Sequence, residues 1–351
     1  MARDDKAIAS ANNPRTVVTP PTPSDSRPPT FPATATAPTV ASLPAAPGSL
    51  AARADVQAFI RQMAAQHGFS QTELSALFSR AHAQPDIVAL ISRPAEGKPW
   101  YAYRRIFLTA ARIQGGVSFW RANRDALARA EQVYGVPAEI IVAIIGVETS
   151  YGGNMGKYRV LEALATLAFD YPKRADFFRK ELENYLVLTR DEGIDPLSLQ
   201  GSYAGAMGLG QFMPSSFLSY AVDFDGDRRR NLWTNPRDAI GSVANYLSGH
   251  QWRRGGPIAT PARVNGGQYP VLVDRKLRPP DRPVSELNRQ GVYPVVSVAG
   301  NQPALLLEYE GDGGMEYWLG FDNFYVITRY NHSQLYAMAV YQLGQEIRGR
   351  I

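Results

Sequence analysis

The hydrophobic and polar positions divide the chain into a polar N-terminal segment, a long helical stretch and a shorter stretch of strand-like runs. Residues 1–49 hold ten of the 26 prolines and almost no large apolar side chains, so burial cannot offset the entropy of ordering them. This composition, rich in Pro, Ala and Thr, predicts a disordered tether. From Asp55 to about residue 250 the apolar residues recur at helical spacing, which predicts a mainly helical region.

Several helix starts are predicted within this region from capping residues. Ser70-Gln-Thr-Glu73 is a capping-box arrangement that precedes an apolar helical pattern. Pro236 suits the first turn of a helix that begins at Asn235, and Asp238 is placed to cap that helix as its third residue. Further starts are predicted near Ser118, Pro137, Lys173 and Ser215.

Between about residues 257 and 320 the pattern changes to short β-branched and aromatic runs separated by Gly, Pro and Asn. The runs are residues 269–273, 292–298 and 304–309, and they predict a small β subdomain. A strong helical pattern from Gln334 predicts a C-terminal helix that packs back on the helical core. The predicted class is mainly α (α+β), with an N-terminal helical domain (50–135), a helical core (136–256), a β subdomain (257–320) and a C-terminal helix (321–351).

Composition and charge narrow the classes of partner. The 351 residues carry a formal net charge of +5, which favours an anionic partner such as nucleic acid, a membrane surface or a cell-wall polymer. Basic clusters interleaved with stacking aromatic residues are missing from the sequence, so no nucleic-acid binding is expected. The absence of cysteine excludes disulfides, thiolate metal sites, a cysteine nucleophile and a lipid anchor on an N-terminal cysteine.

The sequence shows no membrane segment and no export signal. The first eight residues lack the apolar core of a signal peptide, and no run of about twenty apolar residues could span a bilayer. We therefore expect a soluble chain without visible membrane attachment. An export signal that was removed, or lost through a misplaced start, stays an alternative.

A single glutamate, Glu148, lies in an otherwise apolar helical run that begins at Ile140. Helical spacing places it on the same face as Ile141, Ile144 and Ile145. An apolar site favours the protonated carboxyl, which is the form that a general acid needs near neutral pH. The alternative is a glutamate that closes a buried hydrogen bond or ion pair at the helix end.

A glycine-rich segment, residues 201–216, is the second unusual feature. Its glycines allow tight turns and close backbone approach, and Ser202, Tyr203 and Gln211 supply hydrogen-bonding groups, so the segment predicts the wall of a binding cleft. A phosphate-binding loop is disfavoured, because no strand pattern precedes the segment and no Gly-Lys-Ser/Thr ending follows it.

An acidic loop, residues 223–238, has the alternation that begins an EF-hand calcium loop. Asp223, Asp225 and Asp227 occupy positions 1, 3 and 5, and Arg229 offers its carbonyl at position 7. Position 12 is not a glutamate, so Asp238 is the expected bidentate ligand of a longer loop. A bound metal would be structural. The alternatives are that Asp238 caps its helix and that residues 228–230, all arginine, neutralise the acidic trio.

Several ordered motifs together resemble the lytic murein transglycosylase B family over roughly residues 55 to 350. The motifs are Val147-Glu-Thr-Ser-Tyr-Gly152, Gly205-Ala-Met-Gly-Leu-Gly-Gln-Phe-Met-Pro-Ser-Ser216, Asn231-Leu-Trp233, Asp238-Ala-Ile-Gly-Ser-Val-Ala-Asn-Tyr246, Arg329-Tyr-Asn-His-Ser333 and Tyr336-Ala-Met-Ala-Val340. The resemblance implies a lysozyme-like helical core. It also implies cleavage of the β-1,4 bond between N-acetylmuramic acid and N-acetylglucosamine in peptidoglycan, with a 1,6-anhydromuramoyl product.

The resemblance further implies roles for particular residues. Glu148 would act first as the acid and then as the base, without a catalytic cofactor, and related loops suggest a structural Ca²⁺. The implied cleft residues are Ser202, Met207, Gln211, Phe212, Tyr246, Tyr330, Asn331 and Tyr336. From composition alone, Met207, Phe212 and Tyr246 are more typical of a core, and Asn331 could cap the last helix. The substrate implies a periplasmic location, and we expect a monomer.

Two rival functions remain from the sequence. The first is a catalytically silent peptidoglycan-binding or scaffold protein that keeps the cleft. The second is a muramidase that uses water and needs a second carboxylate, for which Asp170 is a candidate, although a turn role suits it better.

Overall fold

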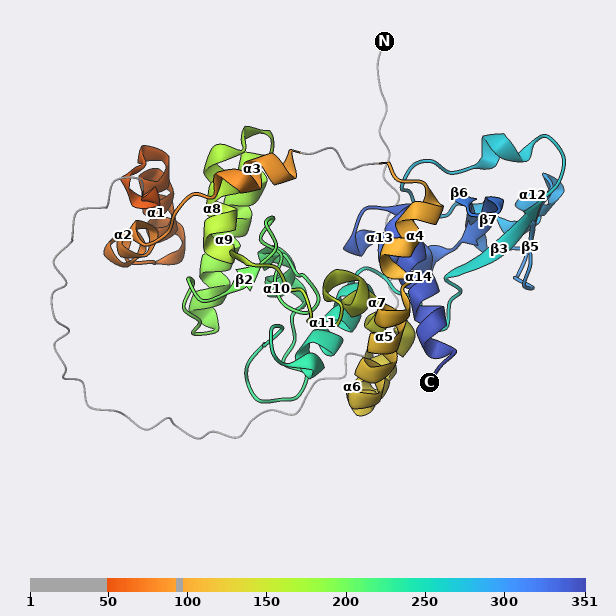
Figure 1. The fold of residues 1–351 in the computed structure, drawn as a ribbon, viewed down its shortest axis with the longest axis horizontal. Helices are drawn as coiled ribbons and strands as arrows, with labels where there is room; N and C mark the ends of the chain where they lie inside the picture. Colours follow the sequence, from red (N-terminus) through yellow and green to blue (C-terminus); the bar gives the residue numbers. More distant parts are fainter. Residues whose placement is uncertain (1–48, 93–96) are drawn as a thin grey trace, which may run out of the picture. The chain divides into compact units, whose positions relative to one another are not determined.

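The computed structural model describes residues 49–92 and 97–351. All the described residues belong to one compact unit. The predicted tether, residues 1–49, lies outside the described residues except for Ser49. Helices dominate the described part and one five-stranded sheet accompanies them, which confirms the predicted mainly α class (Figure 1).

The first helices pack against the middle of the chain. The elements are α1 (Ala54–His67), α2 (Gln71–Ser79) and α3 (Pro85–Ile91), after a short 3₁₀ turn at Leu50–Ala52. The Ser70 hydroxyl accepts a hydrogen bond from the Glu73 N–H, which confirms the predicted cap of α2. α3 contacts α8 (Val160–Asp170), which in turn packs on α9 (Ala175–Asp191).

The next three helices surround a different part of the core. They are α4 (Trp100–Phe107), α5 (Ala110–Ala122) and α6 (Arg124–Tyr134). The predicted helix start near Ser118 is wrong, because Ser118 lies inside α5. Gly115 and Gly116 also lie inside α5, where they leave room for the Tyr151 ring. The division at residue 135 stays a prediction.

Helix α7 (Ala138–Thr149) is the centre of the helical core. Pro137 precedes it as predicted, and nearly every residue of the helix is buried rather than those on one face alone. It contacts α5, α6, α11 (Pro236–Gly249) and α14 (Gln334–Arg348). Among the described residues no single helix is long and apolar enough to cross a bilayer; α6 and α7 pass that test only together, with a bend of 114° between them.

The sheet has the strand order β4-β6-β7-β3-β5. Its strands are β3 (Ala259–Val264), β4 (Arg282–Pro283), β5 (Val292–Pro294), β6 (Pro303–Gly311) and β7 (Gly314–Gly320), and α12 (Val284–Arg289) lies between β4 and β5 in the chain. The predicted strand at 269–273 is wrong: Tyr269–Leu272 form a 3₁₀ turn, and Pro270 has no N–H to donate to a strand ladder.

The two faces of β6 pack on different cores. Leu305, Leu307 and Tyr309 join the main core, where the Tyr309 ring lies 5.4 Å from that of Trp100 in α4. Ala304 and Leu306 instead join a small cluster with residues of α12 and β7. The sheet is therefore anchored in the helical core through its central hairpin.

The C-terminal segment returns to the core, as predicted. α13 (Asp322–Tyr330) contacts α11 and β7, and α14 packs along α7. The Ser333 hydroxyl accepts a hydrogen bond from the Tyr336 N–H and caps α14, so the alternative that Asn331 is the cap is wrong. Two further features complete the fold: the antiparallel pair β1 (Tyr158–Arg159) and β2 (Gln200–Gly201), and α10 (Pro214–Tyr220).

Candidate active site

Glu148 lies in the last turn of α7, half-buried, beside a cavity of about 360 Å³. The other lining residues are Asn154, Gly156, Lys157, Tyr158, Ser202, Tyr203 and Gln211. Three predicted site residues, Glu148, Ser202 and Gln211, therefore meet in one cavity. Glu148 is the only carboxylate among these described lining residues.

The turn after Glu148 is held by unusual backbone geometry. Ser150 and Tyr151 both have left-handed backbone conformations, with φ of 51° and 62°, which non-glycine residues rarely adopt. The Thr149 hydroxyl donates to the Leu209 carbonyl at 2.9 Å and accepts from the Gly152 N–H at 3.0 Å. These contacts end the helix immediately after the carboxylate and attach it to the glycine-rich segment.

The ring of Tyr151 fits into a notch formed by glycines of two helices. A Cβ at Gly115 or Gly116 of α5, or at Gly146 of α7, would overlap the Tyr151 ring or its hydroxyl. The hydroxyl is buried and makes no hydrogen bond in the structure, and burial raises the pKa of Tyr151. The contact is therefore a packing contact that fixes the turn following Glu148.

The surroundings of Glu148 favour its protonated form. Burial raises its pKa from 4.5 to about 7, although the Tyr336 hydroxyl, which donates to Oε1 at 2.6 Å, lowers it. Tyr336 comes from α14 and is 2% exposed. A pKa near neutrality suits a group that must first donate and then accept a proton. The environment is the apolar one predicted for Glu148, and its catalytic role stays a prediction.

The glycine-rich segment forms the opposite wall of the cavity. Gly201 of β2 pairs with Tyr158 of β1, and Met207 exchanges backbone hydrogen bonds of 2.9 Å with Phe212. The Ser202 hydroxyl accepts from the Ala206 N–H at 3.0 Å. The Gln211 amide donates to the Gly208 and Met155 carbonyls at 3.0 and 3.2 Å. Ser202 and Gln211 are thus held in place at the cavity by local bonds.

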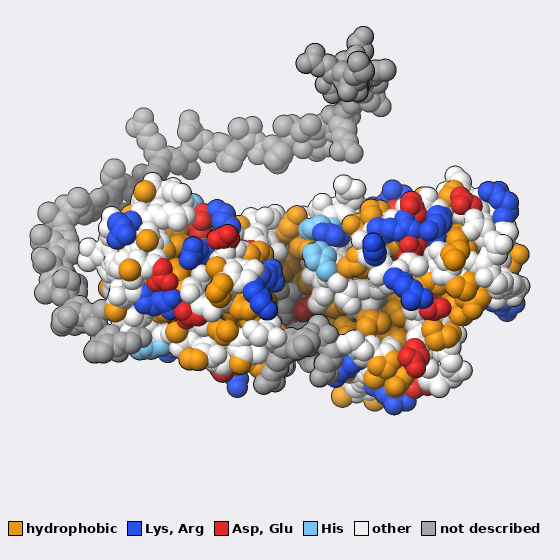
Figure 2. Space-filling model, turned by 90° about the horizontal axis from the view of Figure 1, so that it is seen from above, with side chains coloured by type: hydrophobic (Ala, Val, Ile, Leu, Met, Phe, Trp, Pro, Cys, Tyr) orange, Lys and Arg blue, Asp and Glu red, His pale blue; other side chains and the backbone are white. Residues whose placement is uncertain are grey.

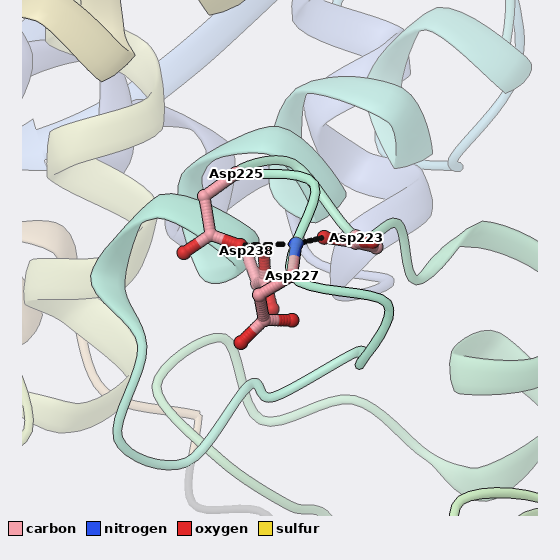
Figure 3. Close-up of side chains that lie close together, drawn as sticks. All are labelled: Asp223, Asp225, Asp227 and Asp238. Atoms are coloured by element: carbon pink, nitrogen blue, oxygen red, sulfur yellow. Dashed lines mark hydrogen bonds between the residues drawn. The ribbon is translucent and has the colours of Figure 1, made fainter.

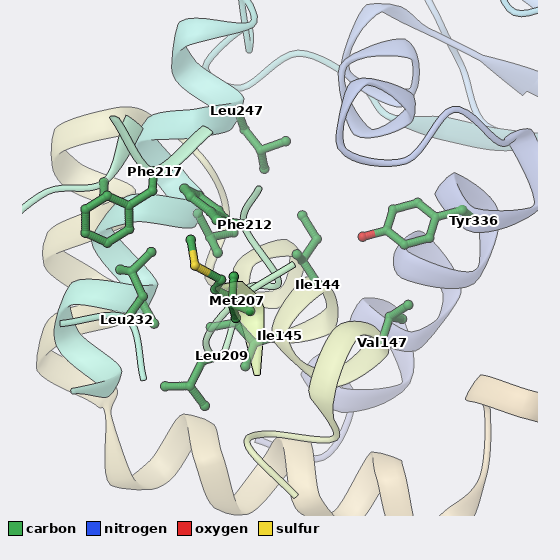
Figure 4. Close-up of a cluster of buried hydrophobic side chains, with 14 of the residues drawn as sticks. Ile144, Ile145, Val147, Met207, Leu209, Phe212, Phe217, Leu232, Leu247 and Tyr336 are labelled. Carbon is green, nitrogen blue, oxygen red and sulfur yellow. The ribbon is translucent and has the colours of Figure 1, made fainter. Parts of the chain in front are cut away.

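The remaining predicted cleft residues lie behind or beside this wall. Met207 and Phe212 are 0% and 2% exposed and lie among buried apolar side chains (Figure 4). The rings of Tyr246 and Tyr330 pack against Phe212. Their hydroxyls donate to the Arg329 and Gly210 carbonyls at 2.7 and 2.6 Å. These contacts are those expected from the alternative that Met207, Phe212 and Tyr246 pack in the core. A direct role of these residues in sugar binding stays a prediction.

Other residues that line the Glu148 cavity were not predicted from the sequence. Asn154, Lys157 and Tyr158 line the cavity, whereas the predicted Asn331 lies in the exposed turn between α13 and α14. The only sequence signal for the first three was their position directly after the Glu148 motif. The second carboxylate considered for a hydrolase is also placed elsewhere: Asp170 accepts a hydrogen bond from Arg53 at 2.6 Å and does not line the cavity.

The acidic loop brings its four aspartates together (Figure 3). One carboxylate oxygen from each of Asp223, Asp225, Asp227 and Asp238 lies within 4.8 Å of the others. Asp238 is fully buried and accepts from the Phe224 and Asn231 N–H groups, both at 2.8 Å. Burial raises its pKa, and the nearby charges of Asp225 and Asp223 raise it further.

One alternative for this loop is wrong in the structure, and a second is wrong for one of its three arginines. Asn235, not Asp238, caps α11, because its side chain accepts from the Arg237 N–H. The Arg230 side chain pairs with Glu192 instead of the acidic trio, and neutralisation of the trio by Arg228 or Arg229 stays a prediction. The Arg229 N–H donates to Asp227 at 2.8 Å, and a ligand role for the Arg229 carbonyl stays a prediction.

Comparison with known proteins decides the family. The model of the transglycosylase SLT domain family matches residues 51–345. The chain belongs to this family. The membrane-bound lytic murein transglycosylase B of Escherichia coli K12 is 48% identical over 310 residues, which are 86% of this chain and 84% of the relative. By family, the chain is a lytic transglycosylase, as predicted.

Solved structures of family members agree with the fold. The soluble lytic transglycosylase SltB1 of Pseudomonas aeruginosa is 52% identical, with a TM-score of 0.81, and the match covers 84% of this chain and 99% of that one. A lytic transglycosylase of Escherichia coli solved in complex with calcium is 47% identical, with a TM-score of 0.79, and the match covers 85% of this chain and 93% of that one. These matches confirm the predicted lysozyme-like, mainly α architecture.

Proposed function

We propose that this chain cleaves the β-1,4 bond between N-acetylmuramic acid and N-acetylglucosamine in peptidoglycan and leaves a 1,6-anhydromuramoyl end. The observation that carries the proposal is Glu148, a single carboxyl group with a pKa of about 7 beside a cavity whose other described lining residues carry no carboxylate. A reaction with one carboxyl group needs that group both as acid and as base. A pKa near neutrality permits both roles.

The reaction proceeds in two proton transfers through Glu148. The protonated carboxyl first donates its proton to the glycosidic oxygen, the bond from that oxygen to the muramoyl C1 breaks, and the N-acetylglucosamine side leaves with a hydroxyl group. The acetamido oxygen of the substrate stabilises the positive charge at C1. The C6 hydroxyl then attacks C1, and the Glu148 carboxylate takes its proton. Glu148 is regenerated and no water is consumed.

Other residues position the substrate in this proposal. Ser202 and Gln211 face the cavity with their polar groups already oriented by backbone bonds. Tyr158 and Tyr203 supply aromatic surface at the same cavity, which suits the C–H faces of sugars. The buried side chains of Met207 and Phe212 support the wall from behind, together with the half-buried rings of Tyr246 and Tyr330, and Asn331 lies at the exposed end of α13.

The test is mass spectrometry of the muropeptides released from purified sacculi by the wild type and by Glu148→Gln. Anhydromuramoyl products from the wild type and none from the variant are the expected result. Reducing ends would overturn the proposal in favour of a hydrolase that uses water. Release of nothing by the wild type, with binding to sacculi retained, would favour a silent scaffold protein.

We also propose that the acidic loop binds a structural Ca²⁺. Four carboxylates and a carbonyl are hard oxygen ligands of the kind that Ca²⁺ prefers. The fit is supported by the convergence of the carboxylate oxygens and by the buried position of Asp238, whose charge has no cationic side chain paired with it among the described residues. The ion would hold Asp223, Asp225, Asp227, Asp238 and the Arg229 carbonyl together.

We propose a periplasmic site of action, because the substrate lies there. The Escherichia coli relative is named as membrane-bound, which accords with this location. We propose further that the chain acts as a monomer on glycan strands.

A further inference from the structure

A second cavity, of about 480 Å³, lies where the C-terminal end of α11 meets α13. Residues 279 and 280, both proline, form part of its wall, and His250, Arg253, Asp322, Tyr325 and Arg329 give it a polar lining. None of these residues lines the Glu148 cavity. The cavity therefore needs an account of its own.

The second cavity shares a wall with the aromatic residues behind the Glu148 cavity. The His250 ring stacks on Tyr246, with centroids 4.2 Å apart and planes 24° apart. The Tyr246 hydroxyl donates to the Arg329 carbonyl at 2.7 Å, and the next residue, Tyr330, packs on Phe212. A ligand in this cavity would thus lie next to the residues that support the glycine-rich wall.

The charges in the cavity do not balance. Arg253 pairs with Asp322 at 2.6 Å, which cancels both charges. Arg329 pairs with no carboxylate among the described residues; its guanidinium lies 3.4 Å from the Tyr325 hydroxyl and 5.6 Å from the centre of that ring. One positive charge is therefore left in a hollow. Figure 2 shows histidine and basic side chains together at the edge of a hollow on this face.

The neighbouring groups add donors and acceptors for a peptide. The Nδ1 of His250 lies 2.7 Å from the Tyr246 carbonyl, and because a carbonyl only accepts, Nδ1 carries the proton. In the neutral ring, Nε2 is then free to accept from an amide N–H. An arginine beside such an acceptor matches a carboxylate attached to an amide chain.

We propose that this cavity binds a free carboxylate of the stem peptide attached to the muramoyl residue. The inference rests on the proposed function, because the stem peptide belongs to that substrate. The peptide leaves the glycan beside the site of cleavage, and Arg329 pairs with its carboxylate. Arg329 is a binding residue, and its effect should fall on KM rather than on kcat.

The experiment compares three glycan substrates prepared from the same sacculi. The first keeps its stem peptides, the second has the peptide carboxylates converted to amides, and the third has the peptides removed, which leaves the lactyl carboxylate. Arg329→Gln should lower kcat/KM about tenfold or more on the first, mainly through KM, and change it by less than about twofold on the others. Arg329→Lys should give an intermediate loss, since it keeps the charge without the planar fork.

A matched control removes an equal charge elsewhere. Arg263→Gln acts on an arginine of β3 outside both cavities and should behave as the wild type on all three substrates. Equal losses on all three substrates, or no loss on the first, would overturn the inference. A loss on the stripped strands would overturn it in favour of the lactyl carboxylate. Failure of the wild type to release anhydromuramoyl products from any substrate would refute the proposed function, and the inference with it.

Discussion

The hydrogen bond between Tyr336 and Glu148 provides the sharpest test of the mechanism. Tyr336→Phe removes the hydroxyl that donates to Oε1 at 2.6 Å and keeps the buried ring. The bond stabilises the carboxylate, so its loss should raise the pKa of Glu148 above about 7. A hydrogen bond to a charged group contributes about 1.5–3 kcal/mol, and one pKa unit corresponds to about 1.4 kcal/mol. The expected rise is therefore about one to two pKa units.

The assay is the pH dependence of kcat/KM for release of anhydromuropeptides. In the proposed mechanism Glu148 must be protonated to begin the reaction, so the alkaline limb of the profile should follow its pKa. In Tyr336→Phe that limb should move up by about one to two pH units. The maximal rate should fall by about 10-fold to 100-fold, because the carboxyl group loses the contact that orients it.

Tyr341→Phe is the matched control on the same helix. Its hydroxyl donates to the Ala259 carbonyl at 3.0 Å, away from Glu148. The control should leave the alkaline limb in place. An unchanged or lowered alkaline limb in Tyr336→Phe would refute the assignment of this bond as the contact that tunes Glu148.

Three further predictions concern stability. Burial raises the pKa of Glu148 from 4.5 to about 7, so the charged carboxylate destabilises the folded state. The free energy of unfolding of the wild type should therefore fall as the pH rises from about 4.5 to about 7. In urea titrations, Glu148→Gln should be more stable than the wild type by about 3 kcal/mol at about pH 8 and little different at about pH 4. Excess Ca²⁺ should raise the melting temperature by about 5 °C or more, and Asp225→Asn should abolish this rise without lowering the Ca²⁺-free value, because Asp225 is exposed. Tyr151→Phe should leave stability unchanged or higher, because the lost hydroxyl has no partner, whereas Gly146→Ala should cost about 1–3 kcal/mol through overlap with the Tyr151 ring.

Each of these predictions can fail in a defined way. A Glu148→Gln advantage that does not grow with pH would contradict the raised pKa. An equal Ca²⁺ response in Asp225→Asn and in the control Asp125→Asn would place the ion elsewhere. A large loss of stability in Tyr151→Phe would show that the hydroxyl has a partner, such as a bound water.

The sequence predicted the helix that carries Glu148 because the residues that mark this helix are neighbours in the chain. Pro137 before the run and a continuous apolar stretch both lie close to Glu148 in the chain. The glycine-rich segment added Ser202 and Gln211, which do lie in the same cavity. Periodicity alone could not show that the helix is covered on every side, since that depends on α5, α6, α11 and α14.

Long-range pairing explains what the sequence did not predict. Tyr158 reaches the cavity because β1 pairs with β2, so that Tyr158 lies opposite Gly201. β7 was missed because glycine occupies both of its ends and Glu316 interrupts its apolar pattern, and its register comes from the hairpin with β6. The run at 269–273 has strand composition, but its backbone forms a 3₁₀ turn.

The packing of β6 on two cores limits how the sequence of this enzyme can vary. One of its faces completes the main core through Leu305, Leu307 and Tyr309, and the other completes the small cluster around α12. Recombination that exchanged residues 257–320 as a cassette would open the helical core as well. We therefore expect the sheet to be inherited together with the helices that surround Glu148, and variation in this region to be confined to the loops and edge strands that neither core needs.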